Sequence, residues 1–391
     1  MNNDNTVNLT QPILPIEYSG STAKGTTTGF WYNDGGAPIF SVLISIRILM
    51  SLIGIAGNSM VIHASIKNKN VIGKSFRYLN RVVLSLAVSD LVYSILGQPF
   101  DMLYWYYNLS DVGPMLRKTG RTWIMSIVTF PQDVCAGASC YHVALIVFLR
   151  CLCLIHPMTF REWHNRLSCI SIIGIWTLMI GIVLSPTIIS TQMTTKEGKE
   201  KNNHHYGNAW NVVDNVTIAL PVLLNVIFSC AKVFLLKKRR IAKEADDFIS
   251  TQKTTTFDSE GKPNSVSSNQ ASRHSKHKSL ERMIQLVAIG TVICYTPDII
   301  FRSYIIEMLR QNKKIYASTG TVLFFFFARL GVQITSIINP FIYATTIPQF
   351  KKLAKRNLRY FLRNKNDEPS VQMPLNTADV STSKTTGNQK K

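Results

Sequence analysis

Two polar residues stand inside stretches of sequence that are otherwise strongly apolar. Asp90 lies in the run LSLAVSDLVYSILGQPF, and Asn339 precedes Pro340 in the run SIINPFIYATTIP. A carboxylate or an amide that is buried in hydrocarbon without a partner costs several kcal/mol. Such residues persist when other helices of a bundle supply partners, and they then usually mark a functional site. We therefore expect Asp90 and Asn339 to share one polar centre.

The elements that must position this centre are long apolar blocks, each of about 20 residues or more. Each block can cross a hydrocarbon core of roughly 30 Å as a helix. The seven blocks are about 39–66, 79–106, 123–155, 168–190, 213–237, 281–309 and 318–346. The fold class predicted from this pattern is an all-α membrane protein, a bundle of seven transmembrane helices.

Composition limits the possible partners. The chain has 391 residues, 46% of them hydrophobic, and a formal net charge of +21. A strongly basic chain can bind nucleic acid, but here the apolar residues are gathered into membrane-length blocks. We therefore expect the lipid bilayer, and not nucleic acid, as the surrounding partner.

The distribution of basic residues predicts the orientation in the membrane. If the N-terminus is extracellular, the cytoplasmic segments hold 29 of the 43 lysines and arginines, as the positive-inside rule requires. Three glycosylation sequons, at Asn8, Asn108 and Asn215, also fall on the side that this topology places outside. Both patterns predict a multi-pass protein of the plasma membrane with an extracellular N-terminus.

The segments outside the apolar blocks differ in composition. Residues 1–38 are polar and are predicted to form an extracellular tail without a cleavable signal peptide. The bundle covers 39–347 and contains a flexible cytoplasmic loop at about 238–280. Residues 348–362 alternate basic and apolar residues at helical spacing, which predicts an amphipathic eighth helix on the membrane surface. Residues 363–391 are predicted to be a disordered cytoplasmic tail.

The cysteines and the remaining motifs do not indicate catalysis. All seven cysteines lie in predicted helices or at their cytoplasmic ends, so we expect no extracellular disulfide and no metal site. Neither HExxH nor a phosphate-binding glycine loop is present. His142 and Cys294 are isolated, and core packing explains both better than an enzyme site does. We expect that the chain is not an enzyme and carries no cofactor, apart from the ion considered below.

An ordered set of motifs, one for each helix, resembles the rhodopsin-like (class A) G-protein-coupled receptors from about residue 39 to residue 362. One NPxxY motif in a membrane helix is a modest signal, whereas the ordered set is very specific. The matching residues are Gly57-Asn58, Asn80, Leu86-Ala87-x-x-Asp90 and Pro99, Ser139 and Arg150 with Ile155-His156-Pro157, Trp176 and Pro186, Pro221, Cys294-x-x-Pro297, and Asn339-Pro340-x-x-Tyr343 followed by Phe350.

Several residues depart from the family pattern, and they make the chain an atypical member. The acidic residue expected before Arg150 is Leu149, and the tyrosine expected in the fifth helix is Ser229. These changes affect residues that resemble the activation switch. Further departures are Cys151 for tyrosine, Tyr295 for tryptophan, Thr291 for phenylalanine, and Met125 for the cysteine near the top of the third helix.

The resemblance implies a sodium pocket at mid-membrane depth. Its members offer carboxylate, hydroxyl and amide oxygens, which suit a hydrated sodium ion as an allosteric ligand. A water-filled polar cluster that only holds helices together is the alternative. The set is Asn58, Asp90, Ser139, Ser336 and Asn339.

The resemblance also implies a coupling site at the cytoplasmic end. Arg150 would contact the C-terminal helix of a heterotrimeric G protein when the sixth helix swings outward, with Tyr343, Tyr295 and Pro297 as switch residues. An arginine here could otherwise simply reach the membrane interface. Because Leu149 cannot pair with Arg150, either basal activity is raised or another group restrains the arginine.

The predicted extracellular half contains many charged and amide residues. Asp298 and Arg302 are four residues apart and can pair on one helix face. The charges could pair with one another and bind nothing, or they could form a cavity for a peptide terminus or a zwitterionic small molecule. The candidate pocket residues are Asp101, Gln132, Asp133, Asp298, Arg302, Arg329 and Gln333.

Two of these positions argue against particular ligand classes. Gln132 stands where amine receptors carry their ligand carboxylate, and Asp133 is rotated from that position by about 100°. Gln333 stands where an opsin carries its retinal lysine, so a Schiff base cannot form. These residues make a biogenic amine or retinal a poorer match than a peptide.

A G-protein-coupled receptor therefore explains the motifs, the outer charges and the basic inner face together. Hydroxyl residues in the third loop and tail would allow phosphorylation and an arrestin-like partner. The alternatives are a non-signalling or decoy receptor, given the altered switch, and a membrane transporter. A transporter would more often show repeated halves, and none is apparent.

Overall fold

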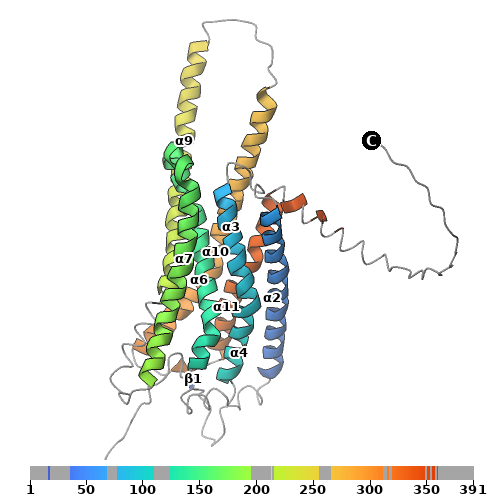
Figure 1. Cartoon of the computed structure of the whole chain (residues 1–391), viewed down its shortest axis with the longest axis vertical. Coiled ribbons are helices and arrows are strands. Elements are labelled where there is room, and N and C mark those ends of the chain that lie inside the picture. Colours follow the sequence, from blue (N-terminus) through green and yellow to red (C-terminus); the bar gives the residue numbers. More distant parts are fainter. Residues whose placement is uncertain are drawn as a thin grey trace, which may run out of the picture.

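The computed structural model describes most of the helical part of the chain. The described residues are 16–17, 36–67, 77–109, 123–194, 213, 215–254, 266–310, 315–316, 319–347, 350–352, 355–356 and 359. Long helices run side by side to form one bundle (Figure 1). They are α2 (Gly36–Lys67), α3 (Arg77–Val92), α4 (Gln98–Leu109), α6 (Trp123–Ile155), α7 (Pro157–Thr194), α9 (Leu220–Thr254), α10 (Val266–Arg310) and α11 (Thr319–Thr346).

Seven helical segments among the described residues are long and apolar enough to cross a membrane. Their number and order confirm the predicted seven-helix bundle. The segments are Ser41–Lys67, Arg77–Leu103, Phe130–Ile155, Pro157–Ser185, Asn215–Ala242, Lys278–Tyr304 and Leu323–Thr346. The described part also contains a two-residue parallel strand pair, in which β1 (Ile16–Glu17) pairs with β2 (Ile315–Tyr316).

One short π-helical turn interrupts the second span and another begins the fifth, and each lies just before a proline. The turn η2 (Tyr93–Gly97) precedes Pro99, and η3 (Asn215–Ala219) precedes Pro221. A proline cannot donate to the carbonyl four residues earlier, and its ring crowds that carbonyl. A wider turn at this point relieves the crowding, and such turns often occur at functional sites.

The helix α6 lies at the centre of the bundle and contacts α3, α4, α7, α9 and α10. In the most apolar window of each span, 72% of the residues are buried in α6 but only 22% in α2. Large apolar side chains on the outer helices are instead exposed, for example Ile170 on α7 and Ile293 on α10. These faces suit contact with lipid, whereas α6 is positioned to connect sites inside the bundle.

At the predicted cytoplasmic end, α9 and α10 project beyond the other helices (Figure 1). The apolar pattern predicted that the fifth block ends at about 237 and that the sixth begins at 281. The helices reach Thr254 and begin at Val266 instead. Lysine, arginine, glutamate and alanine in the run KKRRIAKEA favour helix without apolar packing, so hydropathy alone underestimates the length of α9.

Only part of the predicted eighth helix is described. Phe350 is buried, and its ring lies 6.0 Å from that of Tyr343. The described basic residues that follow, from Lys351 to Arg359, are exposed. This pattern agrees with one apolar and one basic face. The predicted tails, apart from Ile16, Glu17 and the first helical residues, lie outside the described residues.

Candidate functional site

A hydrogen-bonded carboxylate lies at the middle of the bundle, where α3, α6 and α11 meet. One oxygen of Asp90 accepts a hydrogen bond of 2.8 Å from the Ser139 hydroxyl, and the other accepts one of 2.9 Å from the Asn339 amide. All three side chains are buried. The shared centre expected from the sequence is therefore present, formed by residues up to 249 positions apart.

The other two predicted members, Asn58 and Ser336, are linked to each other through the backbone and not to the Asp90 carboxylate. The Asn58 amide of α2 donates to the Gly54 carbonyl at 3.0 Å and to the Ser336 carbonyl at 2.9 Å. The Ser336 hydroxyl donates to the Gln333 carbonyl. We name Asn58, Asp90, Ser139, Ser336 and Asn339 the polar core.

The oxygens of the polar core fit a hard cation. The amide oxygens of Asn58 and Asn339 are buried and accept no hydrogen bond from another described residue. Two free acceptors beside a carboxylate and a hydroxyl form the oxygen set that a hard cation prefers. The core could hold a sodium ion through Asp90 and Ser139, with the two amide oxygens nearby.

At the predicted cytoplasmic end, one carboxylate is bound by two cations. Arg150 of α6 donates to one oxygen of Glu281 on α10, and the Lys232 ammonium of α9 lies 3.1 Å from the other oxygen. Arg150 and Lys232 are almost fully buried, and the Glu281 side chain is 13% exposed. We name these three residues the inner ionic cluster.

The inner ionic cluster bears on the two alternatives left open for Arg150. Leu149, which replaces the family's acid, is buried among apolar residues, while Glu281 pairs with the arginine from another helix. A group that can restrain Arg150 is therefore present.

The three predicted switch residues lie on α10 and α11. The Tyr295 hydroxyl donates to the Ala136 carbonyl of α6 at 3.3 Å. Tyr343 is buried, and its hydroxyl has no hydrogen-bond partner among the described residues. Pro297 lies inside α10. Tyr295 thus links α10 to the central helix α6 by a hydrogen bond. The Tyr343 hydroxyl makes no hydrogen bond to a described residue, and its ring is part of the hydrophobic core.

At the predicted extracellular end, charged side chains from three helices form an outer ionic cluster: Asp133 of α6, Asp298 and Arg302 of α10, and Arg329 of α11. Arg302 Nε donates to Asp298 at 2.8 Å, as expected from the spacing, and another guanidinium nitrogen lies 3.8 Å from Asp133. Arg329 Nε lies 3.7 Å from the second oxygen of Asp298. Asp298 therefore bridges two arginines.

Buried amides lie near the outer ionic cluster on the same helices. Gln132 on α6 and Gln333 on α11 are almost fully buried. The Gln132 amide nitrogen and both side-chain polar atoms of Gln333 have no hydrogen-bond partner among the described residues. Since buried amides normally pair, these groups offer donors and acceptors to a ligand or to water.

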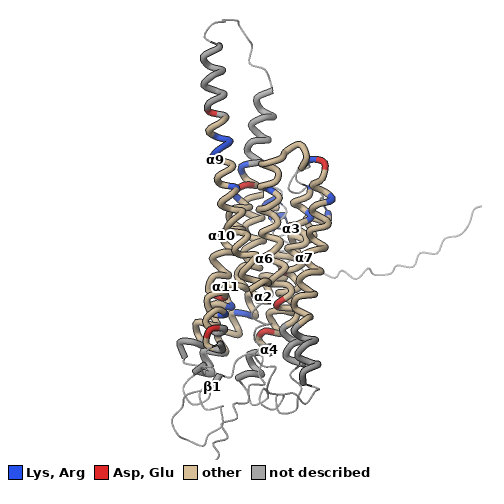
Figure 2. Tube along the Cα trace, turned by 90° about the vertical axis from the view of Figure 1, so that its left-hand side faces the viewer, with Lys and Arg blue, Asp and Glu red and all other residues tan. Residues whose placement is uncertain are grey.

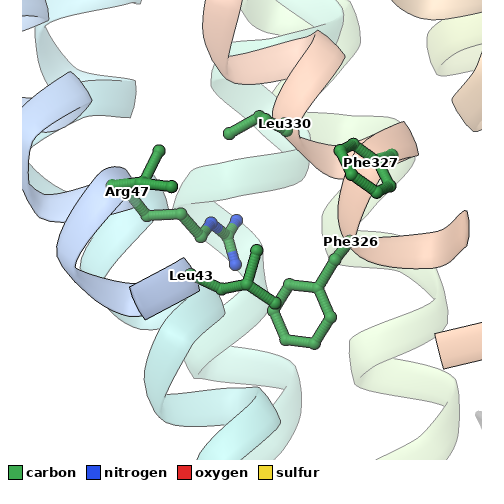
Figure 3. Close-up of a pocket in the computed structure, with 6 residues that line it drawn as sticks. Leu43, Arg47, Phe326, Phe327 and Leu330 are labelled. Carbon is green, nitrogen blue, oxygen red and sulfur yellow. The ribbon is translucent and has the colours of Figure 1, made fainter. Parts of the chain in front are cut away.

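The seventh pocket candidate, Asp101, pairs with a buried cation on the first span. Arg47 of α2 donates to the Asp101 carboxylate of α4, and both are buried. Arg47 extends towards a small hollow between α2 and α11, beside Leu43 and Phe326 (Figure 3). Phe327 and Ile46, which also line the hollow, are exposed on the outside of the bundle. The pair joins the first span to the second.

Most charged residues lie towards the two ends of the described helices, with a largely uncharged zone between (Figure 2). The family profile described as 7 transmembrane receptor (rhodopsin family) matches residues 57–343, which is most of the chain. The chain belongs to this family. The receptor therefore shares the fold and the general signalling role of G-protein-coupled receptors.

Individual relatives of the receptor are distant. The neuropeptide Y receptor type 1 of Xenopus laevis is 22% identical over 351 residues, covering 84% of each chain. The blue-sensitive opsin of Oryzias latipes is 21% identical over 357 residues, covering 88% of each chain. The neuropeptide FF receptor 1 of Rattus norvegicus is 27% identical over 197 residues, covering 49% of this receptor and 41% of that chain.

The predicted glycosylation sites fall in different parts of the receptor. Asn8 lies outside the described residues, and Asn108 lies in α4 with a side chain that is not described. Asn215 is exposed at the start of η3. All seven cysteines are unpaired.

Three charged residues with clear partners were missed as site residues. These are Arg47, Lys232 and Glu281, none of which was predicted as a site residue from the sequence. A lone cation inside an apolar helix was a signal that a carboxylate lies opposite. The sequence could not show which one, because Lys232 and Glu281 belong to no motif and only the packing of α9 against α10 brings them together.

Proposed function

We propose that the receptor binds an extracellular ligand with charged groups, most simply a peptide, at the outer ionic cluster. Ligand binding then leads the receptor to activate a heterotrimeric G protein. The observation that carries this proposal is the position of Asp298 between Arg302 and Arg329. Acidic and basic groups meet there, beside buried amides. The names of two relatives, the neuropeptide Y and neuropeptide FF receptors, support a peptide as the ligand.

The ion pairs already present lower the free-energy cost of keeping buried charges in such a site. Buried charges must be paired, so Asp298 and the arginines stabilise each other when no ligand is bound. A peptide terminus or a charged side chain can take over one partner, so no charge is left alone. The buried amides of Gln132 and Gln333 can then supply directional hydrogen bonds, which distinguish one ligand from another.

The first experiment identifies the ligand class. Cells expressing the receptor are screened with a peptide library, and nucleotide exchange is measured on co-expressed G proteins of the main classes. A hit is then tested on Arg329→Gln, for which we expect a loss of potency of about tenfold or more, as for removal of one charge-assisted pair. Arg77→Gln changes an exposed arginine at the inner end of α3 and should retain full potency.

We propose that the polar core binds a sodium ion that stabilises the resting receptor. Support comes from the carboxylate, the hydroxyl and the two amide oxygens without donors. A cluster that only binds water would give the same helix contacts but no dependence on sodium over other monovalent cations.

We propose that the receptor lies in the plasma membrane with its N-terminus outside. The basic residues at one end and the sequons at the other support this orientation. The proposed domain boundaries are a tail at 1–38, a bundle at 39–347, a membrane-surface helix at 348–362 and a cytoplasmic tail at 363–391, with phosphorylation sites for an arrestin-like partner. An N-terminal tag that antibodies detect only after permeabilisation would contradict the orientation.

A second candidate function is a receptor that binds its ligand without activating a G protein. Leu149 and Ser229 favour it, because neither can perform the role of the family's acid and tyrosine. High-affinity binding of a peptide with no exchange on any G-protein class would select this function. Flux of the ligand across the membrane would instead indicate a transporter.

A further inference from the structure

Arg81 of α3 contacts α7 through one nitrogen of its guanidinium. This atom, Nη1, donates to the Asn165 carbonyl and to the Cys169 sulfur, each at 3.2 Å. Neither partner is an anion, and Arg81 forms no ion pair with any residue that the structure describes. Arg81 is partly buried, so an anion from outside these residues would stabilise its charge. Elsewhere in the bundle, four arginines do pair with carboxylates: Arg47, Arg150, Arg302 and Arg329.

The remaining donors of Arg81 are well placed for a phosphate group. Its Nε and Nη2 atoms donate to none of the described residues, and together they form one edge of the planar guanidinium. Two N–H groups on such an edge match two oxygens of a phosphate, which is why arginine is a preferred phosphate ligand. The bonds from Nη1 to α7 fix the plane of the guanidinium, so this edge is already oriented.

Arg81 lies at the inner boundary of the apolar part of both helices. On α3 it is the last charged residue before Asp90, and on α7 Arg166 precedes an uncharged run that extends to residue 185. Because Arg81 contacts Asn165, the residue next to Arg166, the two arginines lie at the same level. Phospholipid headgroups lie where the hydrocarbon core meets water. Both cations are therefore at headgroup depth.

One face of α7 continues from this level into the hydrocarbon. Its members follow at spacings of three or four residues, so they share a helix face, and all are exposed: Trp163, Arg166, Ile170 and Ile173. Tryptophan prefers the membrane interface. On the same side, a Cβ atom at Gly174 would meet nothing within 4 Å, so an acyl chain can lie close to the backbone. The face thus offers a cation at headgroup depth and an apolar surface beyond it.

We propose that Arg81 and Arg166 bind the phosphate of an anionic phospholipid in the inner leaflet, with an acyl chain along this face of α7. The leaflet rests on the proposed orientation of the receptor, and nothing here depends on coupling to a G protein. Anionic lipids are concentrated in the cytoplasmic leaflet. The phosphate links α3 to α7, because it contacts one cation from each helix. We name Arg81, Trp163 and Arg166 the inner lipid site.

The charge of the inner lipid site favours an anionic lipid over a zwitterionic one. Glu162 is the only acid between residues 157 and 185. It is exposed, and no ion pair joins it to Arg166, although both residues are described. The two arginines and this acid leave a net charge of +1. A phosphatidylcholine headgroup would bring its own cation to this surface, whereas phosphatidylglycerol brings only the negative charge.

Quenching of tryptophan fluorescence by brominated lipids tests the site at the position of Trp163. The full-length receptor is placed in nanodiscs of phosphatidylcholine with a minor fraction of phosphatidylglycerol. The same mole fraction of one lipid or the other carries bromine on its acyl chains. The contribution of Trp163 is the difference from Trp163→Phe. We expect brominated phosphatidylglycerol to occupy the site about tenfold more often than brominated phosphatidylcholine, as for one charge-assisted contact.

Two variants remove the cations singly. In Arg81→Gln and in Arg166→Gln the preference for phosphatidylglycerol should fall towards one. The amide of Arg81→Gln can still donate to the Asn165 carbonyl, so we expect it to fold. Arg166→Gln changes an exposed side chain and tests the site even if Arg81→Gln is unstable. Arg359→Gln removes an exposed arginine from the predicted eighth helix and should keep the wild-type preference.

Inorganic phosphate distinguishes a lipid from a soluble anion. Millimolar phosphate, compared with chloride at the same ionic strength, should leave the lipid preference unchanged, because the acyl chain adds contacts that a free ion lacks. Loss of the preference in phosphate would show a site for a soluble phosphate and overturn the lipid. Equal quenching by the two lipids in the wild type would overturn the site itself. An equal fall in Arg81→Gln and Arg359→Gln would do so too, since it would show only general attraction to a basic surface.

Discussion

Charged side chains that lie inside the apolar helices are paired across the bundle. The Asp90 carboxylate accepts a hydrogen bond from the Asn339 amide, and the Arg47 guanidinium donates to the Asp101 carboxylate. Each of these carboxylates has therefore exchanged water for a partner on another helix, as a buried charge requires.

The pair of Arg47 and Asp101 gives a prediction for stability. Arg47→Met leaves the Asp101 carboxylate buried without this cation, and Asp101→Leu leaves the Arg47 guanidinium buried without this carboxylate. Each single change should cost about 3–5 kcal/mol, because one charge remains uncompensated. The double variant Arg47→Met/Asp101→Leu should recover most of this loss. Thermal unfolding of the purified receptor measures the effect, and additive losses in the double variant would contradict the pairing.

At the scale of helices, two kinds of contact hold the bundle together. Ion pairs join α2 to α4 and α10 to α6, α9 and α11. Close backbone contact also joins α10 and α11, since a Cβ atom at Gly331 would lie 2.5 Å from the carbonyl oxygen of Cys294. Both kinds concentrate on α10, the helix whose movement the proposed function requires.

The substitution Gly331→Ala should loosen the contact between α10 and α11. The clashing atom belongs to the backbone, so a side-chain rotation cannot relieve it. We expect a loss of about 1–3 kcal/mol, as for other overpacked positions, seen as a lower melting temperature. Gly181→Ala is the control, because a Cβ there meets nothing within 4 Å. Equal melting temperatures for the two variants would contradict the close contact.

The inner ionic cluster gives a prediction for basal signalling. Glu281→Gln removes the charge that holds Arg150 and Lys232, so the open arrangement becomes more populated. Basal nucleotide exchange should rise by about tenfold if the lost contribution is about 1.4 kcal/mol. Glu244→Gln, which changes an exposed acid on α9, should leave exchange unaltered.

The same assay tests the departure at Leu149. Because Glu281 already restrains Arg150, Leu149→Asp should change the basal level of the wild type very little. A large fall in this variant would show instead that the arginine of the wild type is poorly restrained and that the departure raises basal activity.

For the whole molecule, the sequence predicted the seven-helix fold. Seven apolar blocks of membrane length and one motif in each helix indicate this fold independently of one another. The three charged clusters were predicted less completely. The polar core was found through family motifs, and Asp298 with Arg302 through their spacing on one helix. The inner ionic cluster was missed, because Lys232 and Glu281 belong to no motif and acquire a role only when three helices meet.

The polar core lies between the outer and inner clusters, so it can couple them. If sodium binds there and favours the resting arrangement, linkage requires that sodium lowers the affinity of an activating ligand. Asp90→Asn removes the charge that holds the ion, and agonist affinity should then no longer differ between sodium and choline buffers. Thr296→Ala, at an exposed threonine of α10, should keep the wild-type difference. Persistent sodium dependence in Asp90→Asn would exclude the core as the ion site, and the coupling would then have to run through the helix contacts alone.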